Sequence, residues 1–369
     1  MSRPSPHRAR SAALLLLAAA ELGAQAEAAR PQFGLGIEVS EVLLDVLVTD
    51  ADGHVILGLR PEDFVVTSGS DRLEVVGATF YSNRRLLDSP AARQLALDPS
   101  AIPDRRLFVL FFDDQAIRAL EAPELLTRQR RAGREAMSWL DSELLSGDLV
   151  AVAGFRRSHL EVDLDFSADR QALRRAVERA SRGADARPGR SAQREDGAGI
   201  PSLARSLPAP EVLGRDTPTL EKALTVLARA VQPIVGRKNL VLFTSGFGDV
   251  GHLGLFRVDS RRYLPLVQAM NAANFAAYVV DLVSPCASHS LEGSASQLAA
   301  DTGGRAFFGR PSFRRVLGEI GTVTNGYYLV AVRARHPAGE SGYRELAVEL
   351  ANPEFRVTAR RGYRFGAAR

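Results

Sequence analysis

The 369-residue sequence is poor in several residue types, and each shortage excludes a class of protein. Cys286 is the single cysteine, so no disulfide can form within the chain and the fold must depend on its apolar core. The net charge is only +4, and no stripe of basic and aromatic residues occurs, which argues against a nucleic-acid-binding protein. No apolar run approaches the ~20 residues that a membrane-spanning helix requires. What remains, at 46% hydrophobic residues, is the composition of a globular protein.

The first 26 residues have the pattern of an export signal. Basic residues precede a short apolar stretch at 12–20, and Ala24-Gln25-Ala26 supplies small residues at the spacing that a signal peptidase requires. We therefore expect residues 1–26 to be a cleaved signal peptide, and the mature protein to be exported, either periplasmic or secreted.

Both ends of the mature chain have β-type patterns. In residues 37–82, apolar residues recur at alternate positions from Val42 to Val48 before a turn signal at 50–53. Residues 83–104 are polar and proline-containing, as in a linker. Strand-like runs return over residues 326–365. Because neither β end is large enough to bury a good core alone, we expect the two to pack together as one β-sandwich.

Between these ends, residues 105–324 alternate between strand-like and helix-like segments. Leu107–Phe112 is an unbroken apolar run, typical of a strand that is covered on both faces. Too few residues separate the next two strand-like runs for a crossover, so these should form a hairpin. Residues 181–218 are rich in Arg, Gly, Ser and Pro and lack periodicity, which predicts a flexible insertion. The pattern predicts an α/β domain with a doubly wound, mostly parallel, Rossmann-like sheet.

Three stretches resemble catalytic or cofactor motifs but lack a required part. Residues 246–251 match the dinucleotide fingerprint, yet no helix follows directly to hold a pyrophosphate. Ser245 lacks the glycine two residues earlier that a nucleophile elbow needs. Asp113-Asp114-Gln115 has glutamine where an aspartyl-phosphate hydrolase has its second acid. The six histidines are scattered without ligand spacing, so we expect no enzyme and no cofactor; an exported hydrolase using Asp113 is a remote alternative.

The order of strands and helices, with an aspartate at the end of the first strand of the α/β region, resembles the von Willebrand factor type A (VWFA) domain. The whole mature chain resembles the bacterial family of exported VWFA-related proteins. The stretches that carry this resemblance are 48–53, 58–64, 236–246, 298–308, 327–329 and 361–363. The resemblance implies a type A α/β core flanked by the β ends, and a role in protein binding.

In type A domains, the carboxyl edge of the sheet binds a divalent ion through Asp-x-Ser-x-Ser, a threonine and a later aspartate. The positions that match this motif here are Asp113, Gln115, Ile117, Thr217 or Thr219, and Ser245. One carboxylate with one or two neutral oxygens is a poor ligand set for magnesium, which prefers several oxygen ligands in octahedral order. We therefore expect a degenerate, metal-free site.

Two functions follow from this resemblance and stay open. The first is an exported, non-enzymatic protein-binding or scaffold protein. Its partner would contact a rim at the sheet edge formed by Asp113, Asp114, Phe247 and Asp249. The alternative is an ion-dependent adhesion module, in which Asp113 and Thr219 hold a magnesium ion that a partner's carboxylate completes. The residues at the two serine positions and at the later aspartate position favour the first function.

Overall fold

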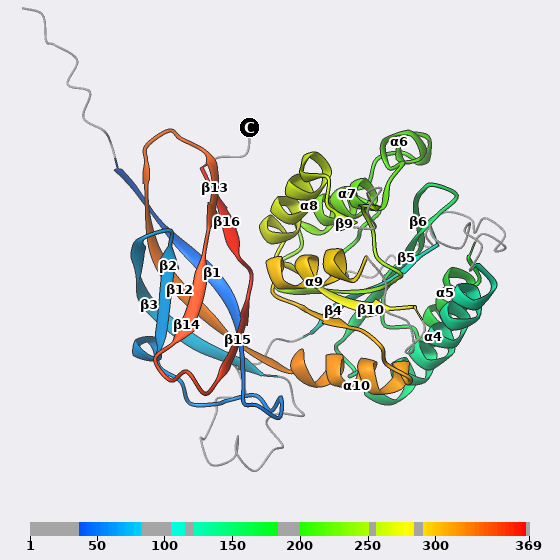
Figure 1. Cartoon of the computed structure of the whole chain (residues 1–369), viewed down its shortest axis with the longest axis horizontal. Coiled ribbons are helices and arrows are strands. Elements are labelled where there is room, and N and C mark those ends of the chain that lie inside the picture. Colours follow the sequence, from blue (N-terminus) through cyan, green and yellow to red (C-terminus); the bar gives the residue numbers. More distant parts are fainter. Residues whose placement is uncertain are drawn as a thin grey trace, which may run out of the picture.

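The structure is a computed structural model that describes residues 37–82, 105–114, 122–183, 200–250, 256–283 and 291–366. A β body formed by both chain ends lies beside an α/β domain formed by the residues between them (Figure 1). The predicted signal peptide and the predicted linker at 83–104 lie outside the described residues. No helix in the described ranges is long and apolar enough to cross a membrane.

The β body is a six-stranded antiparallel sheet in the order β14-β2-β3-β12-β1-β15. Strand β1 (Ile37–Thr49) pairs along β12 (Gly326–Pro337), so the two ends of the chain share one sheet. The edge strands β14 and β15 contact each other, and the sheet therefore curls into a nearly closed barrel in place of the predicted sandwich. The other strands are β2 (Phe64–Ser68), β3 (Asp71–Ser82), β14 (Ala347–Leu350) and β15 (Arg356–Ala359), with a 3₁₀ turn, η1 (Pro61–Asp63), before β2.

The core of the β body follows the alternation in β1. Leu44, Val46 and Val48 are fully buried on one side of the strand, as the period of two requires. Tyr328 packs between the rings of Phe64 and Phe80, with centroid distances of 5.4 and 4.9 Å. A separate ribbon of β13 (Gly342–Glu345) and β16 (Gly362–Phe365) contacts the α/β domain.

The α/β domain contains a six-stranded mixed sheet in the order β11-β10-β7-β4-β5-β6. All neighbouring strands are parallel except β5 and β6, which form the predicted hairpin. Every residue of β4 is buried, as its unbroken apolar run predicts. The strands are β4 (Leu107–Asp113), β5 (Leu149–Arg156), β6 (His159–Ser167), β7 (Lys238–Thr244), β10 (Phe275–Asp281) and β11 (Arg305–Phe307).

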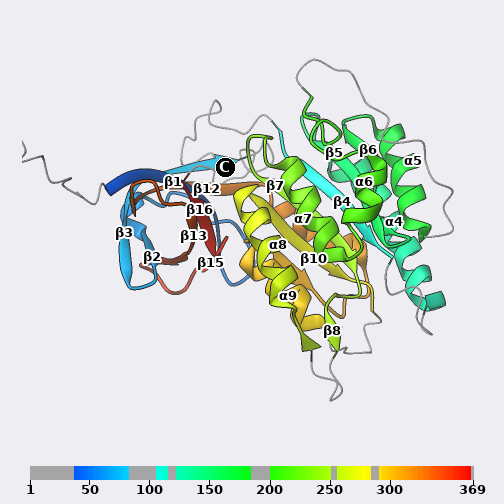
Figure 2. The same cartoon turned by 90° about the horizontal axis from the view of Figure 1, so that it is seen from above.

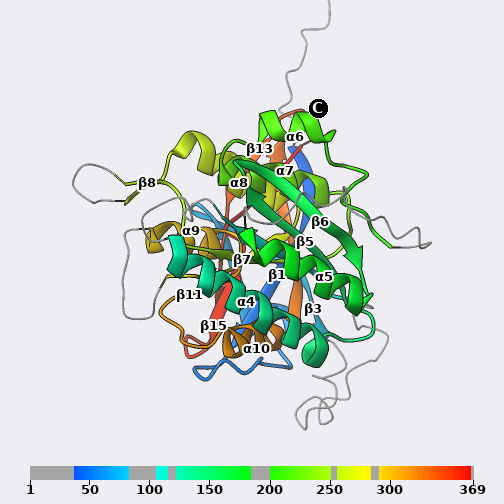
Figure 3. The same ribbon diagram turned by 90° about the vertical axis from the view of Figure 1, so that its right-hand side faces the viewer.

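Helices pack against both faces of this sheet (Figure 2, Figure 3). One face carries α4 (Ala122–Glu143), α5 (Arg170–Ser181) and α10 (Phe313–Val323). The other carries α6 (Pro210–Asp216), α7 (Leu220–Val231), α8 (Ser260–Ala272) and α9 (Glu292–Asp301). A two-residue ribbon of β8 (Asp249–Val250) and β9 (Phe256–Arg257) follows β7.

The prediction of a flexible insertion over 181–218 is wrong for residues 200–218, which contain α6 and pack on the core. The carboxylate of Asp165 in β6 accepts hydrogen bonds from Ser202 Oγ (2.6 Å) and from the backbone N–H of Leu203 (2.7 Å). Leu203 is fully buried and Leu213 is nearly so. A buried carboxylate thus anchors a segment that has no periodicity of its own. Residues 184–199 lie outside the described residues.

Polar groups join the β body to the α/β domain. Arg360 donates to the carbonyl oxygens of Asn271 at the end of α8 (2.6 Å) and of Leu43 in β1 (2.7 Å). The Asn271 side chain donates to the Tyr343 hydroxyl (2.8 Å) and to the Asp301 carbonyl (3.1 Å). These bonds satisfy polar groups of both units at their contact and hold the two together.

Candidate functional site

At the carboxyl edge of the sheet, Asp113 meets side chains from neighbouring strands. The register of the parallel strands brings the ends of β4, β7 and β10 to one level, with Thr244 opposite Asp281. Asp113 is 3% exposed, and its Oδ2 accepts a hydrogen bond from Thr244 Oγ1 at 2.6 Å. Thr244 Oγ1 also accepts from the Gly246 N–H at 3.0 Å. The aspartate that the sequence singles out is therefore tied to the strand beside it.

The two threonines that match the type A motif both have structural bonds. Thr217 is fully buried; its hydroxyl donates to the Leu213 carbonyl (2.6 Å) and accepts from the Leu160 N–H (2.9 Å), which holds α6 against β6. Thr219 is the N-cap of α7 and accepts from the Lys222 N–H at 3.4 Å. Each hydroxyl thus has a local role that explains its position.

Ser245 directly follows β7 and is 7% exposed. The next residue, Gly246, has φ +95°, and a Cβ there would lie 2.5 Å from the Leu291 Cβ, so only glycine fits this turn. The positions of Gln115 and Ile117 lie outside the described residues. The structure therefore brings Asp113 and Ser245 to the same edge and leaves the other two motif positions unplaced.

The choice of Phe247 as a rim residue is wrong, because its side chain is 2% exposed and belongs to the apolar core. Its N–H donates to Ser294 Oγ of α9 at 3.1 Å. Asp113 and Asp114 are also buried, at 3% and 5% exposure. Asp249 begins β8. Asp113, Asp114 and Phe247 therefore do not form the exposed rim that the sequence suggests.

A buried charge cluster on the β5–β6 hairpin was missed by the sequence analysis. Arg156, 2% exposed, donates to Glu161 Oε2 (2.8 Å) and to Asp163 Oδ2 (2.9 Å). Burial raises the pKa of the Asp163 carboxyl, although the charge of Arg156 opposes this rise. Opposite charges on facing strands of a predicted hairpin are the signal that points to this cluster. Since its charges pair with each other, its role is structural.

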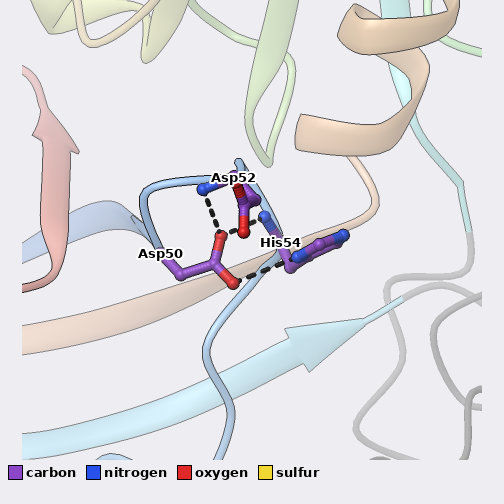
Figure 4. A group of neighbouring side chains, drawn as sticks. All are labelled: Asp50, Asp52 and His54. Carbon is purple, nitrogen blue, oxygen red and sulfur yellow. Dashed lines mark hydrogen bonds and ion pairs between the residues drawn. The ribbon is translucent and has the colours of Figure 1, made fainter.

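Asp50, Asp52 and His54 form a compact group at the turn after β1 (Figure 4). Asp50 Oδ1 accepts from the N–H groups of Asp52 (2.9 Å) and His54 (2.8 Å), and Oδ2 lies 3.0 Å from His54 Nδ1. The backbone hydrogen bond from His54 lowers the pKa of Asp50. These bonds are those of an Asp-stabilised turn, which the sequence predicts at 50–53.

At the opposite, amino edge of the sheet, a cavity of about 250 Å³ lies where the α/β domain meets the β body. We call it the junction pocket. Arg106 precedes β4, Arg237 and Asn239 lie at the start of β7, and Tyr81 and Tyr327 come from β3 and β12. The two tyrosine rings stack at 5.8 Å with an interplanar angle of 17°. The pocket thus joins aromatic rings of the β body to polar groups of the α/β domain.

Arg106 forms a fixed wall of the junction pocket. Its Nε and Nη2 donate to the Asp148 carboxylate at 3.0 and 2.5 Å, and its Nη1 donates to Asn325 Oδ1 (2.7 Å) and the Gly321 carbonyl (3.2 Å). Arg106 and Asp148 are both buried. This bidentate pair fixes the loop before β5 and the end of α10 to the start of β4.

Arg237 and Asn239 have fewer partners than Arg106. Arg237 donates to two neutral oxygens, the Gly303 carbonyl (2.7 Å) and the Tyr278 hydroxyl (3.4 Å), and its guanidinium lies 5.9 Å from the centre of the Tyr327 ring. Asn239 is 3% exposed; its Nδ2 donates to the Leu107 carbonyl (3.1 Å), whereas its Oδ1 has no hydrogen-bond partner within the described residues. The sequence analysis did not identify this site.

No protein-family model and no curated protein matches this chain. Solved structures do. An aerotolerance-related membrane protein from Bacteroides fragilis is 12% identical, and the match covers 59% of this chain and 98% of that one at a TM-score of 0.38. The VWA domain of SpRpn10 is 10% identical over 58% and 94% of the two chains, at a TM-score of 0.31. Proximal thread matrix protein 1 of the mussel byssus, with a zinc-occupied MIDAS motif, is 12% identical. That match covers 59% of this chain and 47% of the other, at a TM-score of 0.33.

These scores and identities are too low to carry an argument about function. The element order of the α/β domain is the one that the sequence resemblance implies: β4 ends in Asp113, and α4, the β5–β6 hairpin, α5, α7, β7, α8, β10, α9 and β11 follow. The α/β domain thus has the type A-like order of elements that the resemblance implies. At the carboxyl edge of this domain, Asp113 and Thr217 both form hydrogen bonds within the fold.

Proposed function

We propose that this protein is an exported, non-enzymatic protein-interaction or scaffold protein whose VWFA-related domain is degenerate and functions without a metal ion. The observation that supports this most directly is the bonding of Asp113. Its carboxylate accepts from Thr244, and the Thr217 hydroxyl already donates and accepts within the fold. In an ion site, these oxygens would have to face the ion.

The energetics of ion binding support the same proposal. Magnesium requires several oxygen ligands in near-octahedral order, and carboxylates supply most of the attraction. Ser245 offers a neutral oxygen at the motif position where a second carboxylate belongs. The one carboxylate at the described motif positions, that of Asp113, also accepts a hydrogen bond from Thr244, which leaves less of its charge for an ion. The balance favours a domain that uses its surface, without an ion, to contact a partner.

Export is the second part of the proposal, and it rests on the sequence of the first 26 residues. If these residues are a cleaved signal, the exported protein begins near Glu27. N-terminal sequencing of secreted or periplasmic material tests this directly. Material that still begins at Ser2 would contradict export by this signal.

Metal independence is tested by thermal unfolding of the mature protein with millimolar magnesium or manganese, or with a chelator. A ligand at 100-fold excess over its dissociation constant stabilises a protein by about 2.7 kcal/mol. That energy would raise the Tm of a domain of this size by several degrees. We expect no such change. A rise of several degrees that Asp113→Ala abolishes would instead support the ion-dependent adhesion module.

A designed variant sharpens this test. Ser245→Asp combined with Ile117→Ser restores two oxygen ligands of the type A motif. Without metal, we expect the variant to unfold at a lower temperature, because two carboxylates then lie close together in a buried place. Millimolar magnesium should restore the loss. Ser245→Asn with Ile117→Ser has the same shape without the added charge, and should show no magnesium response.

A further inference from the structure

The junction pocket has a chemical character that the proposed function does not explain. It lies at the amino edge of the sheet, opposite the edge of Asp113, and combines a cation, an amide oxygen and apolar walls. We propose that the junction pocket binds a carboxylate attached to an apolar group about the size of one amino-acid side chain. A polypeptide C-terminus or a free small carboxylic acid can supply this chemistry.

Arg237 supplies the partly buried charge of the site, whereas Arg105, also in the wall, is exposed. Asp45 acts on the Arg237 charge through space without an ion pair. The Arg237 guanidinium is partly buried, and within the described residues it donates to two neutral oxygens and to no carboxylate. Arg106, in the same wall, is already neutralised by Asp148. The Tyr327 ring supports the Arg237 guanidinium by a cation–π contact, which fixes its direction. A guanidinium held in this way binds a carboxylate through charge-assisted hydrogen bonds.

Asn239 sets a second requirement, namely that the ligand has a hydrogen-bond donor. Its amide is held by the bond from Nδ2 to the Leu107 carbonyl, and the buried Oδ1 has no partner in the described part of the chain. A buried acceptor without a partner costs free energy that a suitable donor restores. The N–H next to the carboxylate in the last residue of a peptide, or in an N-acylated amino acid, is such a donor.

The walls set the size and polarity of the attached group. Tyr81, Tyr327, Leu107 and Ile234 present apolar surface to the cavity. An apolar cavity of about 150 Å³ is large enough to bind benzene. The junction pocket, at about 250 Å³, therefore has room for a leucine-sized group together with its carboxylate.

This inference rests on the proposed function only in taking a partner protein as one source of the carboxylate. The experiment is isothermal titration calorimetry on the full mature chain with N-acetyl-leucine and with N-acetyl-leucinamide, which lacks the negative charge. We expect the acid to bind and the amide to bind about tenfold more weakly or worse. Methylation of the nitrogen in N-acetyl-leucine removes the donor for Asn239, and should weaken binding several-fold.

Protein variants identify the residue responsible. Arg237→Gln should remove the preference for the acid, whereas Arg215→Gln, at a side chain that is 75% exposed on α6, should leave it unchanged. The ligand comparison uses unmodified protein, so it stays decisive even if Arg237→Gln folds poorly. Equal binding of acid and amide, or no binding of either, would overturn the inference. That result would not change the expected metal independence of thermal unfolding. The pocket inference and the proposed function can therefore fail independently.

A tetrapeptide of three alanines followed by leucine distinguishes the sources of the carboxylate. Tighter binding of this peptide than of N-acetyl-leucine would assign the pocket to a polypeptide C-terminus. Equal binding would assign it to a small free acid. The amide form of the tetrapeptide should bind as weakly as N-acetyl-leucinamide in the first case.

Discussion

The two edges of the α/β sheet use their polar residues in opposite ways. At the carboxyl edge, Asp113 bonds to Thr244, and Thr217 bonds to the backbone around it. At the amino edge, Arg237 and Asn239 line a cavity of about 250 Å³. Open α/β sheets usually place their ligands at the carboxyl edge. In this protein, the described residues place hydrogen-bonded side chains at the expected edge and a pocket at the other.

This difference shows that the position of a polar residue is weak evidence without its bonding. Asp113 lies at a strand end where a ligand residue belongs, and its carboxylate accepts a hydrogen bond from Thr244. Asn239 lies at the start of a strand, where sequence reasoning expects only packing, yet its Oδ1 lacks a partner within the described residues. The inventory of donors and acceptors, more than topology, separates structural from functional residues.

The largest expected change in stability concerns the buried ion pair between Arg106 and Asp148 at the amino edge. Arg106→Ala removes one partner of a buried bidentate ion pair and leaves the Asp148 carboxylate without its cation. We expect a loss of about 3–5 kcal/mol in the free energy of unfolding, measured by urea denaturation. Arg174→Ala breaks the pair with Asp141, whose side chains are about half exposed, and should cost less than about 1 kcal/mol. If Arg106→Ala cost as little as Arg174→Ala, the stability of the amino edge would not depend on the pair between Arg106 and Asp148.

The second effect concerns a buried cation at the same edge. Burial lowers the pKa of Lys238 to about 8, although Asp45 attracts its proton. Between about pH 8 and the ordinary lysine pKa of about 10.4, the unfolded chain holds a proton that the folded chain has released, so the free energy of unfolding rises with pH. The full difference is on the order of 3 kcal/mol. Above about pH 10 stability should fall again, because burial raises the pKa of Tyr328 to about 12 and unfolded tyrosines ionise first.

Urea denaturation between pH 7 and pH 10 measures this rise. Lys238→Met should abolish it, because the variant has no ammonium group to bury. The other lysine of the chain, Lys222, is exposed on α7 and provides a matched control. A rise of the same size in Lys238→Met would assign the pH dependence to another group.

The smallest effect concerns the carboxyl edge. Thr244→Val keeps the shape of the side chain but removes the donor to Asp113. We expect a loss of about 1–3 kcal/mol in the free energy of unfolding. Thr322→Val on the exposed face of α10 removes a hydroxyl that bonds only locally, to the Gly318 carbonyl, and should stay within about 0.5 kcal/mol of the unmodified protein. No loss in Thr244→Val would show that the bond to Asp113 contributes little to the stability of the carboxyl edge.

Local pattern was sufficient to predict the main elements of the fold. The apolar run of β4 predicted burial on both faces, and the short connection before β6 predicted a hairpin, because each depends on neighbouring residues alone. The segment 200–218 was not predicted, since it is ordered by a distant carboxylate, Asp165, and by no periodicity of its own. The β body is a curled sheet and not the predicted sandwich. Its curl depends on contact between the edge strands β14 and β15, which local sequence patterns do not show.

The candidate sites were harder to predict for the same reason. Motif spacing predicted that Asp113 and Ser245 lie at one edge of the sheet. It does not show that Thr244 donates a hydrogen bond to Asp113. Phe247 looked like a loop residue and instead packs into the core. The junction pocket needs residues from β3, β7 and β12, which meet only after the β body has paired and docked.

The pairing of β1 with β12 has a consequence for the order of folding. Within the described residues of 37–82, β2 pairs with β3 and Thr49 forms a bridge to Val55. Along its length, β1 pairs instead with strands from residue 326 onward. Closing so long a loop in an unfolded chain is slow and costs entropy. Prior folding of the α/β domain brings the two ends close together and removes most of that cost. The β body should therefore complete last, with β1 the final strand to be protected from hydrogen exchange.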